Sequence, residues 1–434
     1  MIVSFPYAYL GPMHIPDASF AGVYGLPHME AASDVEALMA DRISTPIGTP
    51  PLRELARGKR RLLVVVDDIS RPTPVHRLLP PVLGVLRDAG LDDDSVEFMV
   101  ALGTHRPMTR DEMAQKLGAD VLARHQVHNH DWRDRDACVR VGTTDDGTEV
   151  WVNRKVMEAD LVVGIGRIMP IDICGFTGGG KILIPGVCGR ITNDQMHWHR
   201  VMADDSDIIG HRENAVRKCI DALARQAGLG FILNVIMHGC GHIIDAVAGD
   251  LTEAHRVGCE KSLLAHSTFI PQRPDVVVAD GYPFDIEFWQ VNKALDTAGL
   301  VVRNGGVVIM VSPCYEGFSQ THPEVLQFGY RPISEIIELV ESGRIQHKVV
   351  GVHMCQVRRV IDRATVILVT DGISTEHVES VGLRHAATPD EALATALELA
   401  GGDARVAVLR NAAEMLPIVG VGAEQPRSPE MGID

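Results

Sequence analysis

The sequence has no excess of positive charge and no long apolar run, and each absence excludes a class of protein. A net charge of −16 lacks the basic character that nucleic-acid-binding surfaces need. No apolar run reaches the ~18 residues that suggest a membrane-spanning helix. The N-terminal stretch MIVSFPYAYLGPMHIPD has no basic residue before its apolar ones, so we do not expect a signal peptide. We therefore expect a cytoplasmic protein without a nucleic-acid or membrane partner.

Paired cysteines and dinucleotide-binding glycines are also missing. Eight cysteines are spread singly from Cys138 to Cys355, and none forms a C-x-x-C pair. In a chain of 434 residues this pattern favours free, mostly buried thiols over a disulfide framework. No G-x-G-x-x-G follows an expected strand, which counts against a nucleotide-dependent dehydrogenase with two Rossmann-like domains.

Apolar runs rich in β-branched residues alternate with amphipathic stretches along most of the chain. The runs end in polar residues, as buried parallel strands do at the sheet edge that binds ligands; they are 61–68, 96–103, 159–170, 275–283 and 307–313. We expect helices over 75–89 and over 110–124, the second opened by a capping box from Thr109 to Glu112. The alternation predicts the α/β class with mainly parallel sheets.

The stretch STFIPQRP at 267–274 is the expected domain boundary. We predict an N-terminal cofactor-binding α/β domain over 1–270, a C-terminal α/β domain over 271–421 and a polar tail over 422–434. Small ligands favour clefts between domains, so we expect a cofactor and substrate cleft between these two.

A glycine-rich stretch, GFTGGGKILIPGVCG at 175–189, follows the third strand. Its G-x-x-x-x-G-K spacing matches a P-loop, but Ile182 stands where Ser or Thr would hold Mg²⁺, and ILIPG is typical of a strand and turn. Backbone N–H groups of Gly178–Gly180 could form a nest for an anion. Lys181 adds a positive charge or a nucleophilic amine. The stretch indicates an anionic-ligand site and not an NTPase.

Further polar groups stand at strand ends or on a helix: Asp68 with Arg71, His105, His197, and Gln290 with Lys293. Each alone has a structural explanation, such as a helix cap, a hydrogen-bonded turn histidine or an exposed helix face. Their repeated placement at strand ends favours a joint site. The cations among them would suit an acidic substrate or a phosphorylated cofactor.

The three histidines of the stretch 125–133 could suggest a metal site, but no carboxylate or cysteine stands at ligand spacing. A polar loop is the better interpretation of His125, His128 and His130.

Five segments resemble the signature segments of the lactate racemase family, whose members use a nickel-pincer nucleotide. They are DDISRPTP at 67–74, LGTHRPMT at 102–109, GFTGGGKILIPG at 175–186, His197, and GYPFDIEFWQVNKAL at 281–295. The resemblance covers nearly the whole chain in the family's order and spacing. It implies a nicotinic-acid-derived mononucleotide that carries nickel on two sulfurs and a ring carbon. The implied reaction is racemisation or epimerisation of a 2-hydroxy acid, with hydride passing to the cofactor and back.

The resemblance also implies residue roles. His197 matches the metal ligand, and Lys181 matches the lysine that some members join covalently to the cofactor. His105 matches one of two acid/base histidines. The remaining matches are groups at the cofactor, the reacting centre or the substrate: Thr177, Gly178, Gly179 and Gly180 for the cofactor, Asp68, Arg71 and Lys293 for catalysis, and Arg71, Gln290 and Lys293 also for the substrate carboxylate and hydroxyl.

One departure from the family pattern stands just before the glycines. The second acid/base histidine follows a proline in the family, whereas here Pro170 is followed by Ile171 and Asp172. A racemase needs a proton carrier on each side of its substrate, and isoleucine cannot serve. Asp172 could replace it, another histidine such as His199 or His130 could reach in, or the chemistry could differ.

We therefore predict an isomerase that acts on a small anionic 2-hydroxy acid other than lactate and depends on cofactor-biosynthesis proteins. The alternative is a carrier or sensor that binds the nickel-pincer cofactor without turnover.

Overall fold

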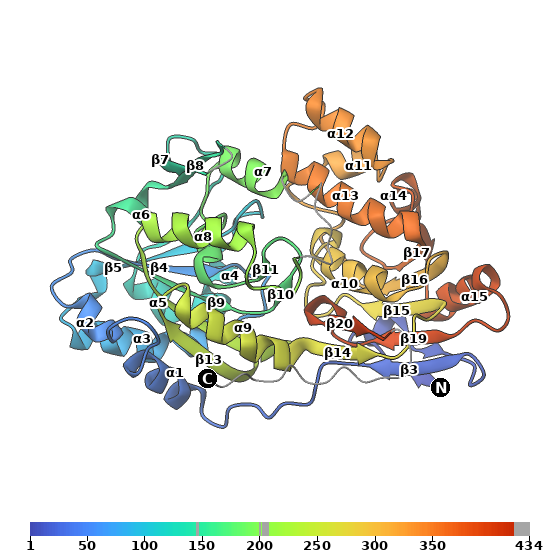
Figure 1. Cartoon of the computed structure of the whole chain (residues 1–434), viewed down its shortest axis with the longest axis horizontal. Coiled ribbons are helices and arrows are strands. Elements are labelled where there is room, and N and C mark those ends of the chain that lie inside the picture. Colours follow the sequence, from blue (N-terminus) through green and yellow to red (C-terminus); the bar gives the residue numbers. More distant parts are fainter. Residues whose placement is uncertain (145–146, 199–200, 202–207, 421–434) are drawn as a thin grey trace. The chain divides into compact units, whose positions relative to one another are not determined.

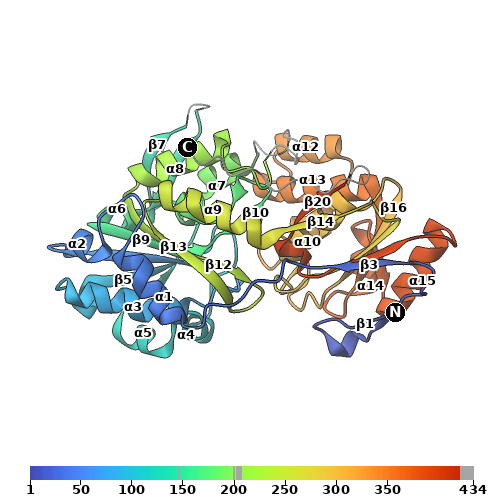
Figure 2. The same cartoon turned by 60° about the horizontal axis from the view of Figure 1, so that its bottom comes forward.

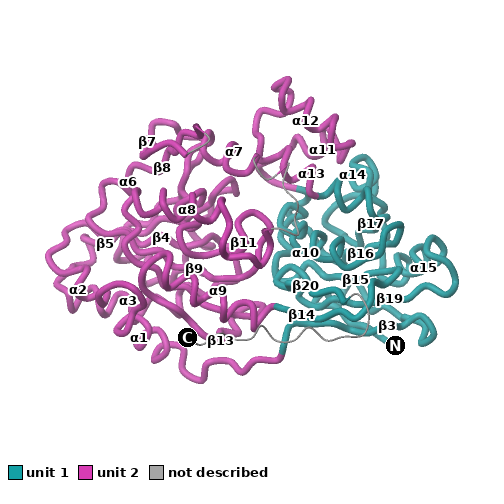
Figure 3. Tube along the Cα trace, in the orientation of Figure 1, with its two compact units in different colours: residues 1–27, 267–318, 357–434 teal, residues 28–266, 319–356 magenta. Residues whose placement is uncertain are grey.

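The computed structural model describes residues 1–144, 147–198, 201 and 208–420 (Figure 1). The chain forms two compact units (Figure 3), and each is described by itself. Unit 1 comprises residues 1–27, 267–318 and 357–434, and unit 2 comprises residues 28–266 and 319–356. None of the helices in the described ranges is long and apolar enough to cross a membrane.

The units differ from the continuous domains expected over 1–270 and 271–421. The chain passes from unit 2 to unit 1 between His266 and Ser267, near the expected boundary. However, residues 1–27 belong to unit 1, because strand β3 (Phe20–Tyr24) pairs in parallel with β19 (Val406–Leu409). Pairing between segments so distant in sequence leaves no local signal at residue 27.

Unit 2 is built on a six-stranded sheet in the order β13-β12-β9-β4-β5-β6. Only β13 runs antiparallel to its neighbour. The strands are β4 (Leu62–Asp67), β5 (Val96–Ala101), β6 (Val127–Asn129), β9 (Leu161–Arg167), β12 (Leu229–His238) and β13 (His242–Gly249). Two antiparallel pairs accompany it: β7 (Cys138–Thr143) with β8 (Glu149–Asn153), and β10 (Pro170–Ile171) with β11 (Gly175–Phe176).

Helices cover both faces of this sheet, and Figure 2 shows α1, α3 and α5 on one side and α8 and α9 on the other. Side chains of β4 alternate accordingly: Leu62 and Val64 enter one hydrophobic core, and Leu63 enters the other. The helices of unit 2 are α1 (Val35–Ser44), α2 (Leu52–Ala56), α3 (Val75–Asp88), α4 (Arg110–Leu117), α5 (Ala119–Arg124), α6 (Arg154–Glu158), α7 (Arg190–Trp198), α8 (Ala215–Gln226), α9 (Glu253–His266), α11 (Glu324–Phe328) and α12 (Ile333–Glu341).

Unit 1 has a six-stranded, fully parallel sheet in the order β18-β17-β16-β15-β19-β3. Its further strands are β15 (Val276–Asp280), β16 (Gly306–Val311), β17 (Ala364–Val369) and β18 (Arg384–Ala386). Two small pairs join it: β1 (Ile2–Val3) with β2 (Met13–His14), and β14 (Ser267–Ile270) with β20 (Leu416–Val419). Its helices are α10 (Phe288–Val301), α14 (Thr375–Ser380) and α15 (Pro389–Ala400), and α13 (Lys348–Arg363) begins in unit 2 and ends in unit 1.

The α/β class with mainly parallel sheets is confirmed, and most expected elements lie within a few residues of their observed bounds. The capping box at Thr109 is present, with both of its hydrogen bonds. Two expectations were wrong. The helix expected over 110–124 is broken at Gly118, whose φ is +99°. No strand forms over 182–186, because the Gly180 carbonyl accepts from Leu183 and Ile184 and curls the chain into turns.

Candidate functional site

A carboxylate–histidine pair stands beyond the ends of two neighbouring strands. Asp68 follows β4 and His105 follows β5, and because these strands are parallel neighbours their carboxyl ends meet at one edge of the sheet. His105 Nδ1 lies 2.5 Å from Asp68 Oδ2. An Nδ1–H that donates to the carboxylate fixes the tautomer, so Nε2 is the ring nitrogen that can take a proton.

Asp68 is held ionised by its surroundings. Burial alone would raise its pKa, but the charges of His105 and Arg71 and the hydrogen bond from Ser70 outweigh burial, and the pKa of Asp68 lies well below its usual range. Ser70 donates to Asp68 Oδ1 from both its N–H, at 3.0 Å, and its hydroxyl, at 2.5 Å. The Arg71 guanidinium donates in turn to the Ser70 hydroxyl at 3.0 Å. Asp68 can therefore stabilise positive charge on His105.

A second buried pair, the ion pair of Lys116 and Asp67, stabilises this loop, and the sequence analysis did not predict it. Lys116 of α4 lies 2.7 Å from Asp67 Oδ1 and donates to the Arg71 carbonyl at 2.8 Å. Burial raises the pKa of Asp67, although Lys116 opposes that shift. The only sequence signal was the doubled Asp67-Asp68, and nothing near it in sequence points to Lys116.

The glycines before Lys181 are required by close packing. At Gly178, with φ of +77°, a Cβ would lie 2.7 Å from Ile168 Cγ1 and 2.8 Å from Asn234 Oδ1. At Gly179, with φ of +57°, it would lie 2.9 Å from the His255 ring. Larger residues would strain the backbone and collide with these neighbours.

The loop is also held by hydrogen bonds from neighbouring elements. Arg217 of α8 donates to the Gly178 carbonyl at 3.1 Å and to the Phe176 carbonyl, and His255 Nε2 lies 2.8 Å from the Thr177 carbonyl. The Gly179 N–H donates to Asn234 Oδ1 at 2.9 Å.

These bonds correct the expected nest. The Gly179 N–H is bonded to Asn234, the Gly180 N–H bonds the Asp221 carboxylate, and the Lys181 N–H bonds the Gly178 carbonyl. The Thr177 hydroxyl is likewise bonded to Arg167 and Met169 of the preceding segment. The Gly179 N–H therefore points toward β12, and the part of the expected nest that it would form is closed to an anion.

Lys181 supplies the reactive group of the loop. Its side chain is half-buried, and no hydrogen bond or ion pair joins its amine to a residue in the described ranges. Burial lowers its pKa, the Cys174 thiol opposes that shift, and the charges of Arg71 and Arg217 lower it further. A lysine with a lowered pKa carries a larger share of neutral, nucleophilic amine. The field of Arg71 also shows that Lys181 lies near the Asp68–His105 pair.

His197 of α7 is arranged as a single ligand. Its Nδ1 lies 2.7 Å from the Asn193 carbonyl one turn earlier, so Nδ1 carries the proton and Nε2 offers a lone pair. Burial lowers the pKa of His197, the bond to Asn193 opposes that shift, and the Lys181 charge lowers the pKa again. Among the described residues no group of three His, Cys, Asp or Glu side chains is placed to hold a metal ion. A metal at His197 would thus need ligands from a bound molecule.

Ile171 and Asp172, the two residues that differ from the family pattern, have different surroundings. Ile171 is buried in the core cluster that also contains Cys174, Phe176 and Met196. Asp172 lies instead against α13, where Gln356 donates to its Oδ2. Its negative charge acts on both Lys181 and His197, so Asp172 belongs to the same site.

Neither of the other histidines considered as the second proton carrier is shown at this site. His130 is buried, with Nε2 bonded to the Cys188 carbonyl at 2.9 Å and Nδ1 to Asn153 at 3.2 Å, so both ring nitrogens are occupied. His199 lies outside the described residues. His128 bonds Glu97 at 2.8 Å and lies in strand β6, so the stretch expected as a polar loop is partly a strand.

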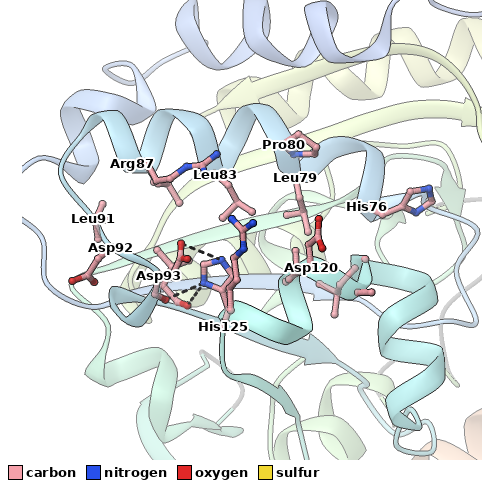
Figure 4. Close-up of a pocket in the computed structure, with 17 residues that line it drawn as sticks. His76, Leu79, Pro80, Leu83, Arg87, Leu91, Asp92, Asp93, Asp120 and His125 are labelled. Atoms are coloured by element: carbon pink, nitrogen blue, oxygen red, sulfur yellow. Dashed lines mark hydrogen bonds and ion pairs between the residues drawn. The ribbon is translucent and has the colours of Figure 1, made fainter.

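His125 lines a cavity of about 440 Å³ between α3 and α5 (Figure 4), where leucines alternate with charged side chains. Its Nδ1 bonds the carbonyls of Asp93 and Val96, both at 3.0 Å. The polar ring of His125 is therefore committed to local structure.

Gln290 and Lys293 lie in unit 1 on one face of α10, as their spacing predicted. Lys293 Nζ donates to Gln290 Oε1 at 2.7 Å and stands 5.2 Å from the centre of the Phe284 ring. Gln290 is buried. The two side chains form one polar unit instead of an exposed face.

The cysteines are confirmed as free thiols, six of the eight buried. Cys174 donates to the Phe176 carbonyl and Cys188 to the Leu183 carbonyl, so both serve the packing of the loop.

The Asp68–His105 pair thus stands at the carboxyl edge of a parallel sheet, where α/β enzymes bind their ligands. Models of the lactate racemase N-terminal and C-terminal domains match residues 10–210 and 271–416. The chain belongs to the lactate racemase family, and is thus a member of a family of racemases.

Its relatives cover most of its length. It is 29% identical over 377 residues to the lactate racemase of Lactiplantibacillus plantarum, covering 85% of this chain and 87% of that protein. It is 28% identical over 383 residues to that of Thermoanaerobacterium thermosaccharolyticum, covering 86% and 88%. The solved lactate racemase apoprotein of the latter organism matches with a TM-score of 0.82 at 26% identity, covering 94% of this chain and 97% of that one. A Thermotoga maritima protein shares the fold, with a TM-score of 0.74 at 22% identity, covering 89% and 98%.

Proposed function

We propose that this protein is a racemase or epimerase of a 2-hydroxy acid other than lactate and uses a nickel-pincer nucleotide. The observation that carries the proposal is the Asp68–His105 pair at the carboxyl edge of the unit 2 sheet. Family membership supports racemisation, and the replacement at Ile171 argues against the ordinary substrate.

Two features of the site fit the cofactor. His197 offers one lone pair from a tautomer fixed by Asn193, which suits a metal whose other ligands come from the nucleotide. Lys181 carries an amine without a protein partner among the described residues, which suits a covalent or ionic link to the cofactor. When bound there, the cofactor would supply a reversible hydride acceptor for the substrate carbon.

The chain's own residues would move the proton and hold the acid. His105 Nε2 takes the hydroxyl proton, and Asp68 stabilises the imidazolium that forms. Such proton transfer contributes roughly 10²–10⁴-fold to a rate. Arg71, Gln290 and Lys293 are proposed for the substrate carboxylate and hydroxyl, since a guanidinium and an ammonium suit a carboxylate.

A cytoplasmic location is proposed as well, supported by eight free thiols, which persist in a reducing compartment.

The test is production of the protein together with the enzymes that make the cofactor. We expect one nickel and one sulfur-bearing pyridinium chromophore per chain. His197→Ala should lose the nickel, whereas His242→Ala, at an exposed histidine of β13, should keep it. Equal nickel content in the two variants would overturn the metal assignment.

Turnover is measured by chiral chromatography across a panel of 2-hydroxy acids. We expect one or more to be racemised or epimerised, with that activity lost in His105→Gln. A loaded protein that racemises none would favour the second candidate, a cofactor carrier or sensor without turnover. The burial of Ile171 in the core, where a second proton carrier is expected, is the observation that favours that candidate.

A further inference from the structure

We infer that Asp172 is the second proton carrier of the site and that Gln356 is its positioning residue. This inference rests on the proposed function, because a racemase requires acid–base groups on both sides of the reacting carbon. The observation that carries it is the contact between the Asp172 carboxylate and the Gln356 side chain, which joins the turn before the glycine loop to α13.

The local backbone explains why Asp172 reaches the site while its neighbour does not. Ile171 ends β10, and its side chain is packed into the hydrophobic cluster beneath the loop. Asp172 lies in the turn that follows β10 and is outside that cluster. It is half-buried, and its charge acts on both Lys181 and His197.

Gln356 fixes one of the two carboxylate oxygens. Its Nε2 donates to Asp172 Oδ2, while no residue of the described ranges donates to Oδ1. The first turns of α13 are themselves anchored beside the site, because the Val349 N–H donates to Asp194 of α7 at 3.4 Å and Lys348 stands 5.9 Å from the Trp198 ring. The amide therefore comes from a supported helix, and Oδ1 remains for a substrate hydroxyl.

The protons balance over one turnover. His105 would take the hydroxyl proton of one enantiomer while the bound cofactor supplies the acceptor for the hydride of the substrate carbon. When that hydride is given back to the opposite face, protonated Asp172 would give its proton to the carbonyl oxygen, which becomes the new hydroxyl. Conversion of the other enantiomer uses the same groups in reverse, and both side chains exchange protons with water between turnovers.

The experiment follows the first half-reaction separately for each enantiomer. Loaded protein is mixed with one pure enantiomer of an active substrate, and bleaching of the cofactor absorption is recorded by stopped flow. In Asp172→Asn, we expect one enantiomer to bleach at the wild-type rate and the other to slow at least 100-fold. His105→Gln should show the opposite preference. Asp362→Asn, at an exposed carboxylate further along α13, should leave both rates unchanged.

Gln356→Leu tests whether Gln356 positions the Asp172 carboxylate. It replaces Asp172→Asn in the experiment if that variant does not bind the cofactor. It should slow only the half-reaction that Asp172→Asn slows, by roughly tenfold, the loss expected for one charge-assisted hydrogen bond. A merely structural change would slow both enantiomers equally. Nickel and cofactor content per chain are measured for every variant.

A second measurement uses unloaded protein. In urea unfolding of Asp172→Asn, Gln356→Leu and the double variant, the two changes should couple by roughly three- to tenfold in the folding equilibrium constant. An absence of coupling would overturn the positioning role.

The possible failures can be told apart. If wild-type protein bleaches with neither enantiomer, the proposed function itself fails. If wild-type bleaches with both and Asp172→Asn does so equally, Asp172 is not the second carrier.

Discussion

Replacement of Gly178 by alanine tests whether the loop is shaped by packing. Gly178 has φ of +77° and ψ of −168°, a region that is essentially restricted to glycine and costs an alanine about 1–3 kcal/mol. The new Cβ would also lie 2.7 Å from Ile168 Cγ1, 2.8 Å from Asn234 Oδ1 and 3.0 Å from the Arg167 carbonyl. Overpacking of this kind costs about 1–3 kcal/mol. Displacement of Asn234 would weaken its bond to the Gly179 N–H, at about 1 kcal/mol.

The chain offers a matched control in Gly58. Its φ is +75°, and a Cβ there would meet nothing within 4 Å. Gly58→Ala therefore carries the backbone cost alone, and the reduced entropy of the unfolded chain is the same for both variants. We expect Gly178→Ala to lower the free energy of unfolding by about 2–4 kcal/mol more than Gly58→Ala.

The assay is urea unfolding of the unloaded protein, followed by nickel content after production with the cofactor enzymes. Gly178→Ala should lose stability and loading together, because displacement of the loop moves Lys181. Gly58→Ala should load normally. Equal losses of stability in the two variants would show that the crowding around Gly178 does not hold the loop, and would refute the packing argument.

Two further predictions concern the charges of the site. The folded-state pKa of Asp68 is lowered, so its ionised form stabilises the fold above the unfolded pKa of about 3.9, and that contribution is lost as pH falls through the lower folded value. Asp68→Asn should therefore cost about 1–3 kcal/mol at pH 7, with the difference from wild type shrinking below about pH 4 in acid unfolding curves; a difference independent of pH would contradict it. The pKa of Lys181 is also lowered, so its acylation rate in unloaded protein should level off at a lower pH than that of the exposed Lys59, as measured by peptide mass spectrometry; parallel pH profiles would contradict the shift.

Local patterns predicted the elements and the strand ends of the site well. The buried run of β4, the capping box at Thr109 and the placement of Asp68 and His105 all depend on residues close in sequence. Because parallel strands bring their carboxyl ends together, the sequence was enough to predict that these strand ends share a site, but not that Asp68 and His105 form a pair.

Contacts between distant segments could not be predicted in this way. Lys116 braces Asp67 from another helix, and Gln356 meets Asp172 across 184 positions of the chain. The first 27 residues join unit 1 through the pairing of β3 with β19 and through side chains of residues 3–15 that enter its hydrophobic core. The hydrogen bond from the Gly179 N–H likewise depends on Asn234, a side chain of the distant strand β12. The glycine-rich sequence alone could not show that this N–H is already bonded within the protein.

The bracing of the glycine loop also has an entropic consequence. Arg217, His255 and Asn234 fix the backbone of residues 176–179 through the protein's own hydrogen bonds. Ordering a flexible backbone costs roughly 1–2 kcal/mol per residue, and here that cost falls on folding instead of on ligand binding. The loop is thus preorganised, and the free energy of each contact that a ligand makes with it is not reduced by a cost of ordering the loop.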